Sequence, residues 1–203
     1  VLYCRTTENR INYFFHFLVT FTMAHLISLA SYYGPMIGAT EMDYYYYSAN
    51  ILYMLAYIFL IIKVLNKLDI QMLFRQFTIP ILILVILDIF CVSIITATTE
   101  TKLTFSEYTL EYAYNAVIMI LLSVVLINYM YRNDNKSMLL LIGSIFAVFS
   151  EIIQLAYYYI LASNDLGFVF SFFHVIGFIF FYMQSQLEFT GPIEAYADEQ
   201  LKA

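Results

Sequence analysis

Two acidic residues interrupt long apolar stretches of this sequence close to their centres. Asp88 lies in the stretch 76–97, and Glu151 lies in the stretch 137–161. If such a stretch crosses a membrane, a carboxylate at that depth is costly. It then faces the inside of a helical bundle or a wet cavity and marks a candidate functional site. Shielding from water also favours the protonated carboxyl group, which is the form that acts as a general acid. We predict that both residues are functional.

Further polar side chains occur at a similar depth on the other apolar stretches. Gln154 follows Glu151 by about one helical turn and lies on the same face of that helix. The other members of this polar band are His25, Asn50, Tyr53, Tyr57, Tyr112, Asn115 and His174. With the two acidic residues they place a polar group on every stretch, which predicts a polar cavity in the outer half of a bundle. The alternative for Asn50, Asn115 and Gln154 is a hydrogen bond between two helices, worth about 1 kcal/mol each.

Two histidines and two carboxylates could also bind a divalent metal ion. The sequence has no His-Glu-x-x-His or similar spacing, and we predict neither a metal nor any other cofactor. Glu111 is close to the outer end of its stretch, which predicts a solvated surface position. The last apolar stretch has no lysine for a retinal Schiff base, and the chain has no phosphate-binding loop motif.

The elements that must position these residues are six apolar stretches. They cover residues 11–32, 48–66, 76–97, 109–131, 137–161 and 167–187. Each is roughly 19–25 residues long, the length that a helix needs to cross a hydrocarbon core of about 30 Å. The predicted fold class is therefore all-α: a polytopic integral membrane bundle of six transmembrane helices.

The basic residues predict which way this bundle faces. Successive gaps between the stretches, together with the two ends of the chain, must lie on alternating sides of the membrane. Eight of the nine Lys and Arg residues then fall on one side, and only Lys102 falls on the other. Short loops rich in Lys and Arg remain cytoplasmic, so we predict that both termini are cytoplasmic. Residues 1–191 form a single bundle in this interpretation, and 192–203 form an acidic cytoplasmic tail. The expected location is the bacterial inner membrane.

Composition narrows the classes of partner. The chain has 203 residues, is 63% hydrophobic and only 12% charged, and carries a net charge of −6. That balance disfavours nucleic acid as a partner. Membrane lipids are the expected partners, with other membrane subunits as the alternative. Cys4 and Cys91 are predicted at the inner face and within the bilayer, so no disulfide is expected.

Three segments of the chain follow a pattern known from other membrane proteins: Tyr112–Met119, Gly143–Glu151, and Phe181–Leu187 with Gly191 close behind. They resemble the YhhN family of membrane proteins, which includes the lysoplasmalogenases. The family has a Tyr and a Met in the first segment, a Gly-x-x-x-Phe-x-x-Ser-Asp pattern in the second and a Tyr-x-x-Gln pattern in the third. The start of the chain, Tyr3–Arg10, resembles the basic loop after the second helix of the family. By that alignment, two N-terminal helices of the family are missing here.

Two departures from the family pattern concern carboxylates. The Ser-Asp pair of the family is Ser150-Glu151 here, which keeps the carboxylate on a longer side chain. The Gly-Asp pair in the helix after the basic loop is Ala24-His25 or His25-Leu26, depending on register. A carboxylate is lost there in either register.

The resemblance implies hydrolysis of the vinyl ether bond of lysoplasmalogens, which yields an aldehyde and a glycerophospho-base. A vinyl ether is hydrolysed when a proton is delivered to carbon and water attacks the resulting oxocarbenium ion. By resemblance Glu151 is the acid, and Asp88 and His25 are candidates for orienting water and stabilising the cation. The predicted substrate-binding residues are Tyr112, Asn115, Gln154, His174 and Gln184.

The competing interpretation is a non-enzymatic membrane subunit, or a lipid-binding component of a larger complex. Such a subunit is expected to present small or polar residues on its outward surface, whereas a free-standing enzyme is expected to be apolar all round. A small-molecule carrier is a third possibility. It needs access from both sides of the membrane, and the polar band lies only in the outer half.

Overall fold

The computed structural model describes residues 13–34, 42–161 and 163–188. Within these ranges the chain is all-helical and has no strand, as predicted. Six of its helices are long and apolar enough to cross a membrane. They are α2 (Tyr13–Ser31), α3 (Tyr44–Leu65), α5 (Thr78–Ala97), α6 (Phe105–Arg132), α7 (Asn135–Tyr159) and α8 (Asn164–Ser185).

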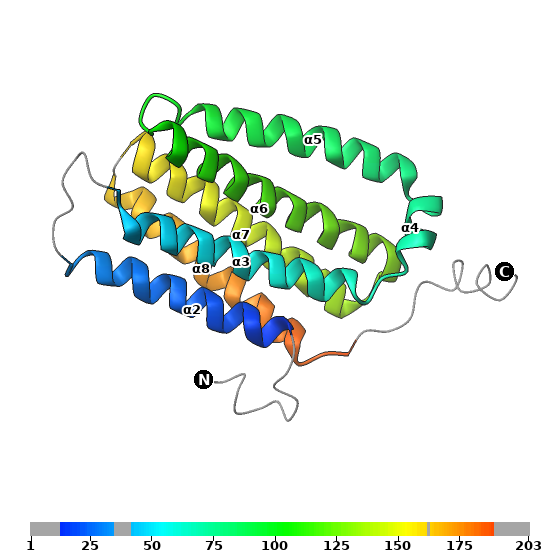
Figure 1. The fold of residues 1–203 in the computed structure, drawn as a ribbon. Helices are drawn as coiled ribbons and strands as arrows, with labels where there is room; N and C mark the ends of the chain where they lie inside the picture. The colour runs from blue at the N-terminus through cyan, green and yellow to red at the C-terminus, as the bar shows by residue number, and fades with distance from the viewer. Residues whose placement is uncertain (1–12, 35–41, 162, 189–203) are drawn as a thin grey trace, which may run out of the picture.

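Helix α4 (Ile70–Gln76) was not among the predicted elements. Asp69 begins it, because its side chain accepts a hydrogen bond from the backbone N–H of Met72 at 3.1 Å. Its seven residues are too few to cross a membrane, and it leads directly into α5 (Figure 1).

Helices α3 and α6 each begin four residues before the predicted apolar stretch. Asp43 caps α3 by accepting a hydrogen bond from the N–H of Tyr46 at 3.0 Å. Thr104 and Glu107 form a capping box at the start of α6. The caps lie in the polar sequence beyond the apolar stretch, so hydropathy alone places the boundary too far inward.

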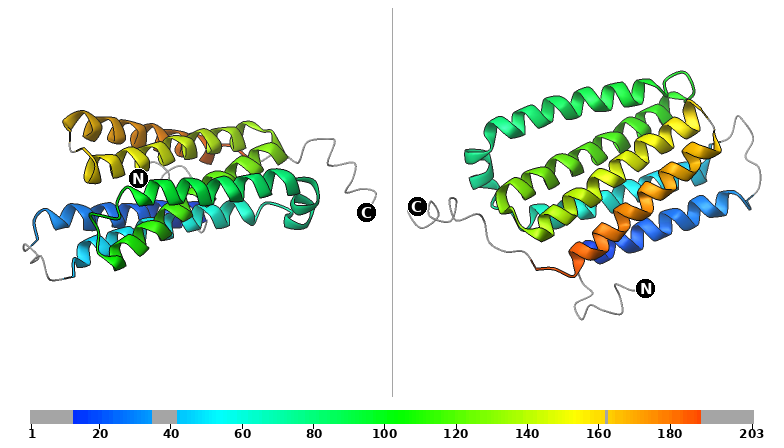
Figure 2. Two further views of the ribbon diagram at one scale, coloured as in Figure 1. Left: turned by 90° about the horizontal axis from the view of Figure 1, so that it is seen from above. Right: turned by 180° about the vertical axis from the view of Figure 1, so that it is seen from behind.

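The long helices pack in two layers. Figure 2 shows α7 and α8 lying side by side across α2, α3 and α6, with α5 at the edge beside α6. Helices α6 and α7 form an antiparallel pair whose turn depends on Asn133, which has a φ of 49°. This left-handed conformation is one that Asn tolerates better than most residues.

Small residues let α7 and α8 approach closely. A Cβ atom added to Gly143 would lie 2.8 Å from Cδ1 of Phe181 and 3.1 Å from the backbone oxygen of Gly177. Phe181 is in turn part of an aromatic cluster with Phe17 of α2, at a ring-centroid distance of 5.6 Å. Close helix contact and ring packing therefore hold α8 against both α7 and α2.

Basic side chains collect at the end of the bundle that carries α4 and the α6–α7 turn. The Arg132 guanidinium donates to the backbone oxygen of Lys67, and the Lys136 ammonium donates to that of Leu187. Lys102 lies in the α5–α6 turn at the opposite end, called the outer end below (Figure 1). The charge separation agrees with the sequence, whereas the cytoplasmic position of the termini stays a prediction.

Several features used in the sequence argument lie outside the described residues. They are Cys4, Arg5, Arg10 and the segment Tyr3–Arg10, together with Gly191, Lys202 and the acidic tail 192–203.

Candidate functional site

A polar cavity of about 740 Å³ occupies the outer half of the bundle. Helices α2, α3, α6, α7 and α8 all contribute to its wall, and α5 does not. Five of the predicted site residues line it: His25, Asn115, Glu151, Gln154 and His174. Asn50 and Tyr53 of the predicted polar band line it as well. Among the described residues of its wall there are three acidic side chains and no Lys or Arg.

Glu151 of α7 lines the inner part of this cavity. The hydroxyl of Tyr57 on α3 donates a hydrogen bond of 2.6 Å to its carboxyl oxygen Oε1. Tyr57 is only 1% exposed, and the Tyr114 hydroxyl on α6 lies near the same carboxyl group. Three helices therefore hold the carboxyl group in one orientation, which a positioned proton donor requires.

Two histidines line the same cavity as Glu151, His25 on α2 and His174 on α8. The His25 ring nitrogen Nδ1 lies 2.8 Å from the hydroxyl of Tyr53. The rings of His25 and His174 are 5.5 Å apart between centroids. Phe21 packs against both rings, at 4.8 Å from His25 and 5.2 Å from His174, so α2 and α8 fix the two imidazoles together.

The hydrogen bonds of Ser150 define the tautomer of His174. The Ser150 hydroxyl donates to the backbone oxygen of Phe170 at 2.8 Å and lies 3.2 Å from Nδ1 of His174. Because a hydroxyl has one proton, Nδ1–H must be the donor to Ser150. The other nitrogen of the neutral ring, Nε2, is then an acceptor. It is buried and has no hydrogen-bond partner among the described residues.

Glu111 corrects the sequence-based prediction of a surface position. It is 7% exposed and lines the cavity. The Tyr46 hydroxyl and the Asn115 amide nitrogen each lie 3.4 Å from one of its carboxyl oxygens. The available signal was its spacing from Tyr114 and Asn115, because residues three and four apart share a helix face.

The structure places Asp88 away from this cavity and does not bring it to Glu151. Its carboxyl oxygens accept from the Ser123 hydroxyl of α6 at 2.9 and 2.8 Å, and the side chain is half-buried between α5 and α6. The reason is the position of α5, which packs at the edge of the bundle against α6. Asp88 is therefore a helix-to-helix contact in this structure.

Two predicted substrate-binding residues also lie outside the cavity wall. Tyr112 is 39% exposed, while Tyr114, two residues later and on another face of α6, lines the cavity instead. Gln184 is fully buried and accepts from the Lys63 ammonium at 3.3 Å. It follows His174 by ten residues on α8, which places it about 15 Å farther inward.

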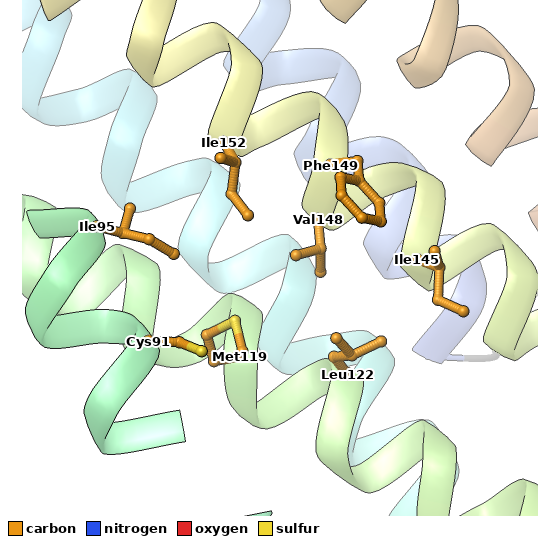
Figure 3. A pocket seen from close by; sticks show the side chains of 8 residues that line it. All are labelled: Cys91, Ile95, Met119, Leu122, Ile145, Val148, Phe149 and Ile152. Carbon is orange, nitrogen blue, oxygen red and sulfur yellow. The ribbon is translucent and has the colours of Figure 1, made fainter. Parts of the chain in front are cut away.

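A second pocket, of about 340 Å³, lies between α5, α6 and α7 (Figure 3). Its lining is made of Cys91, Ile95, Met119, Leu122, Ile145, Val148, Phe149 and Ile152. Apart from the Cys91 thiol these side chains are hydrocarbon or thioether. They offer contact to an apolar chain and no proton donor of the kind found beside Glu151.

Comparison with models of protein families, with curated proteins and with solved structures finds no match to this chain. Within the described ranges, no group of three or more His, Cys, Asp or Glu residues is arranged to hold a metal ion. The geometry of the cavity is therefore the main evidence for the function of this chain.

Proposed function

We propose that the outer cavity is the active site of a membrane-embedded hydrolase that cleaves the vinyl ether bond of lysoplasmalogen-type lipids. The observation that carries this proposal is the buried carboxyl group of Glu151, held at 2.6 Å by Tyr57 in a cavity shared with two histidines. The resemblance to the YhhN family, in which the matching residue is an Asp after a Ser, points to the same carboxyl group.

Glu151 would deliver the proton that starts the reaction. Its proton passes to the vinyl carbon remote from the ether oxygen, and the adjacent carbon becomes part of an oxocarbenium ion. The Glu151 carboxylate formed in this step faces the cation across the cavity and stabilises it. Tyr57 donates to this carboxylate, and such a hydrogen bond is stronger to the ionised than to the neutral group.

His174 is suited to hold the water that attacks next. His174 lines the cavity, its Nε2 atom is a buried acceptor without a partner among the described residues, and its Nδ1–H is oriented by Ser150. Water donates a hydrogen bond to Nε2 and adds its oxygen to the cation. The resulting hemiacetal returns one proton to Glu151 and splits into an aldehyde and the glycerol hydroxyl, which completes the addition of one water.

The outward surface favours this proposal over an accessory subunit. Helix α5 has large apolar side chains on the surface that faces away from α6, among them Ile79, Ile86 and Phe90. Helix α8 also has exposed large apolar side chains, among them Phe168 and Phe172. Large apolar side chains suit contact with lipid, and they are not the small or polar residues expected at a helix-to-helix interface.

The test is aldehyde release from a lysoplasmalogen by the purified full chain in detergent. Glu151→Gln should abolish release, because the amide still forms hydrogen bonds but has no acidic proton to transfer. Asp88→Asn is the matched control, since it makes the same change in a carboxyl group outside the cavity, and it should leave the rate within about twofold of the wild type. A wild type inert toward vinyl ether lipids, or an active Glu151→Gln variant, would refute the hydrolase.

A further inference from the structure

We infer that the outer part of the cavity, around Glu111, binds the ammonium group of a lipid headgroup. The orientation of the lipid in the cavity rests on the proposed function, which places the vinyl ether bond at Glu151. The ammonium subsite itself can be tested without any hydrolysis.

The charge of the cavity wall selects for a cation. Asp43 and Glu111 are the acidic side chains in the outer part of the wall, and among the described residues of the wall there is no Lys or Arg to neutralise them. Glu111 is buried, and its two hydrogen-bond partners are neutral and long, at 3.4 Å each. A buried carboxylate without a cationic partner is strongly disfavoured, and a bound ammonium group would supply that partner.

The surroundings of Glu111 are also aromatic. The Tyr46 hydroxyl approaches Glu111, and Tyr159 lies close to both residues. Both tyrosines line the cavity, as does Tyr45. Aromatic rings attract ammonium groups through their negative faces, and rings combined with a carboxylate are typical of sites for quaternary ammonium ligands.

The helix register places Glu111 at a suitable distance from Glu151. Helix α6 ends at Arg132 and α7 begins at Asn135, so residues equally far from this turn lie at equal depth. Glu111 is 21 residues before Arg132, and Glu151 is 16 residues after Asn135. The difference of five residues corresponds to about 7.5 Å along the helices. Each side chain leans toward the N-terminus of its own helix, which separates the two carboxyl groups further.

A lysoplasmalogen can bridge these two positions. Eleven bonds join the vinyl carbon that receives the proton to the nitrogen of a choline or ethanolamine headgroup, which is a reach of up to about 13 Å. The phosphate between them would meet neutral donors of the cavity wall, such as Gln154 and Tyr158. A headgroup with a net negative charge would instead face Glu111 and Asp43 without compensation.

The binding test uses an alkyl-ether lysophosphocholine, which has no vinyl carbon to protonate and is not cleaved. The reference lipid is an alkyl-ether lysophosphoglycerol with the same chain. The wild type should bind the phosphocholine lipid about tenfold more tightly, and Glu111→Gln should remove most of that preference. Asp88→Asn and Glu151→Gln should retain it. Equal binding of both lipids by the wild type, or an unchanged preference in Glu111→Gln, would overturn the subsite.

A second measurement needs no variant and decides the matter if Glu111→Gln does not fold. Tetramethylammonium chloride should displace the phosphocholine lipid from the wild type, whereas sodium chloride of equal ionic strength should not. Equal displacement by both salts would overturn the subsite. If vinyl ether lipids are not hydrolysed and the phosphocholine preference is nevertheless found, the hydrolase fails and the ammonium subsite stands.

Discussion

The contact between Tyr57 and Glu151 can be tested with a double-mutant cycle. Tyr57→Phe keeps the ring, which is buried at 1% exposure, and therefore leaves no cavity. Its cost is confined to the hydrogen bond and to the carboxyl group that loses a donor, about 1–2 kcal/mol. Glu151→Leu alone should cost about 1–2 kcal/mol, because it leaves the buried Tyr57 hydroxyl without its acceptor.

The informative quantity is the coupling free energy between the two changes. Once the Tyr57 hydroxyl is gone, replacing Glu151 by Leu removes no shared bond, so the double variant should be less destabilised than the sum of the single variants by about 1 kcal/mol. The free energy of unfolding is measured by titration with sodium dodecyl sulfate in mixed micelles. Additivity to within about 0.3 kcal/mol would refute the 2.6 Å contact as a stabilising interaction.

The pair Ser123 and Asp88 is the control for this cycle. It also joins a hydroxyl to a carboxyl group, at 2.8 and 2.9 Å, but lies outside the cavity. Ser123→Ala with Asp88→Leu should show coupling in the unfolding measurement and leave aldehyde release unaltered. Tyr57→Phe, in contrast, should lower aldehyde release by about tenfold, because the carboxyl group then has one fewer positioning contact.

Three further predictions concern neighbouring features of the bundle. Ser150→Ala should lower kcat by about tenfold with little change in KM, because His174 loses the acceptor that orients its ring. Ser150→Thr keeps a hydroxyl group and should restore part of the rate. A change in KM alone would contradict this role. Gly143→Ala should destabilise the bundle by about 1–3 kcal/mol in the same unfolding titration, because the new methyl group would lie 2.8 Å from Phe181. Gly167→Ala is the control and should be neutral, because the nearest atom to its methyl group would be 3.5 Å away. In a variant with Cys4 and Cys91 replaced by Ser, a cysteine at Asn164 should react with an impermeant reagent added outside intact cells, and one at Glu188 should not; the reverse labelling would overturn the predicted topology.

The sequence alone was sufficient to predict the six membrane-spanning helices and the depth of their polar groups. Hydropathy and helix length are properties along the chain, and the hydrocarbon thickness converts them directly into spans. The rise of 1.5 Å per residue then gives the depth of each polar residue. For this reason Glu151, His25 and His174 could be predicted to lie in one band, and the structure places all three at one cavity.

Only the tertiary structure decided which residues of that band face one another. Helix α5 is apolar around most of its circumference, so its sequence does not reveal that it packs at the edge and directs Asp88 to Ser123. In the same way, the rotation of α6 brings Glu111 into the cavity and leaves Tyr112 outside it. The physical reason is that close packing with neighbouring helices, as at Gly143 and Gly177, sets the rotation of a membrane helix about its axis. A hydrophobic pattern does not reveal this rotation, because the lipid and the core of the bundle are both apolar.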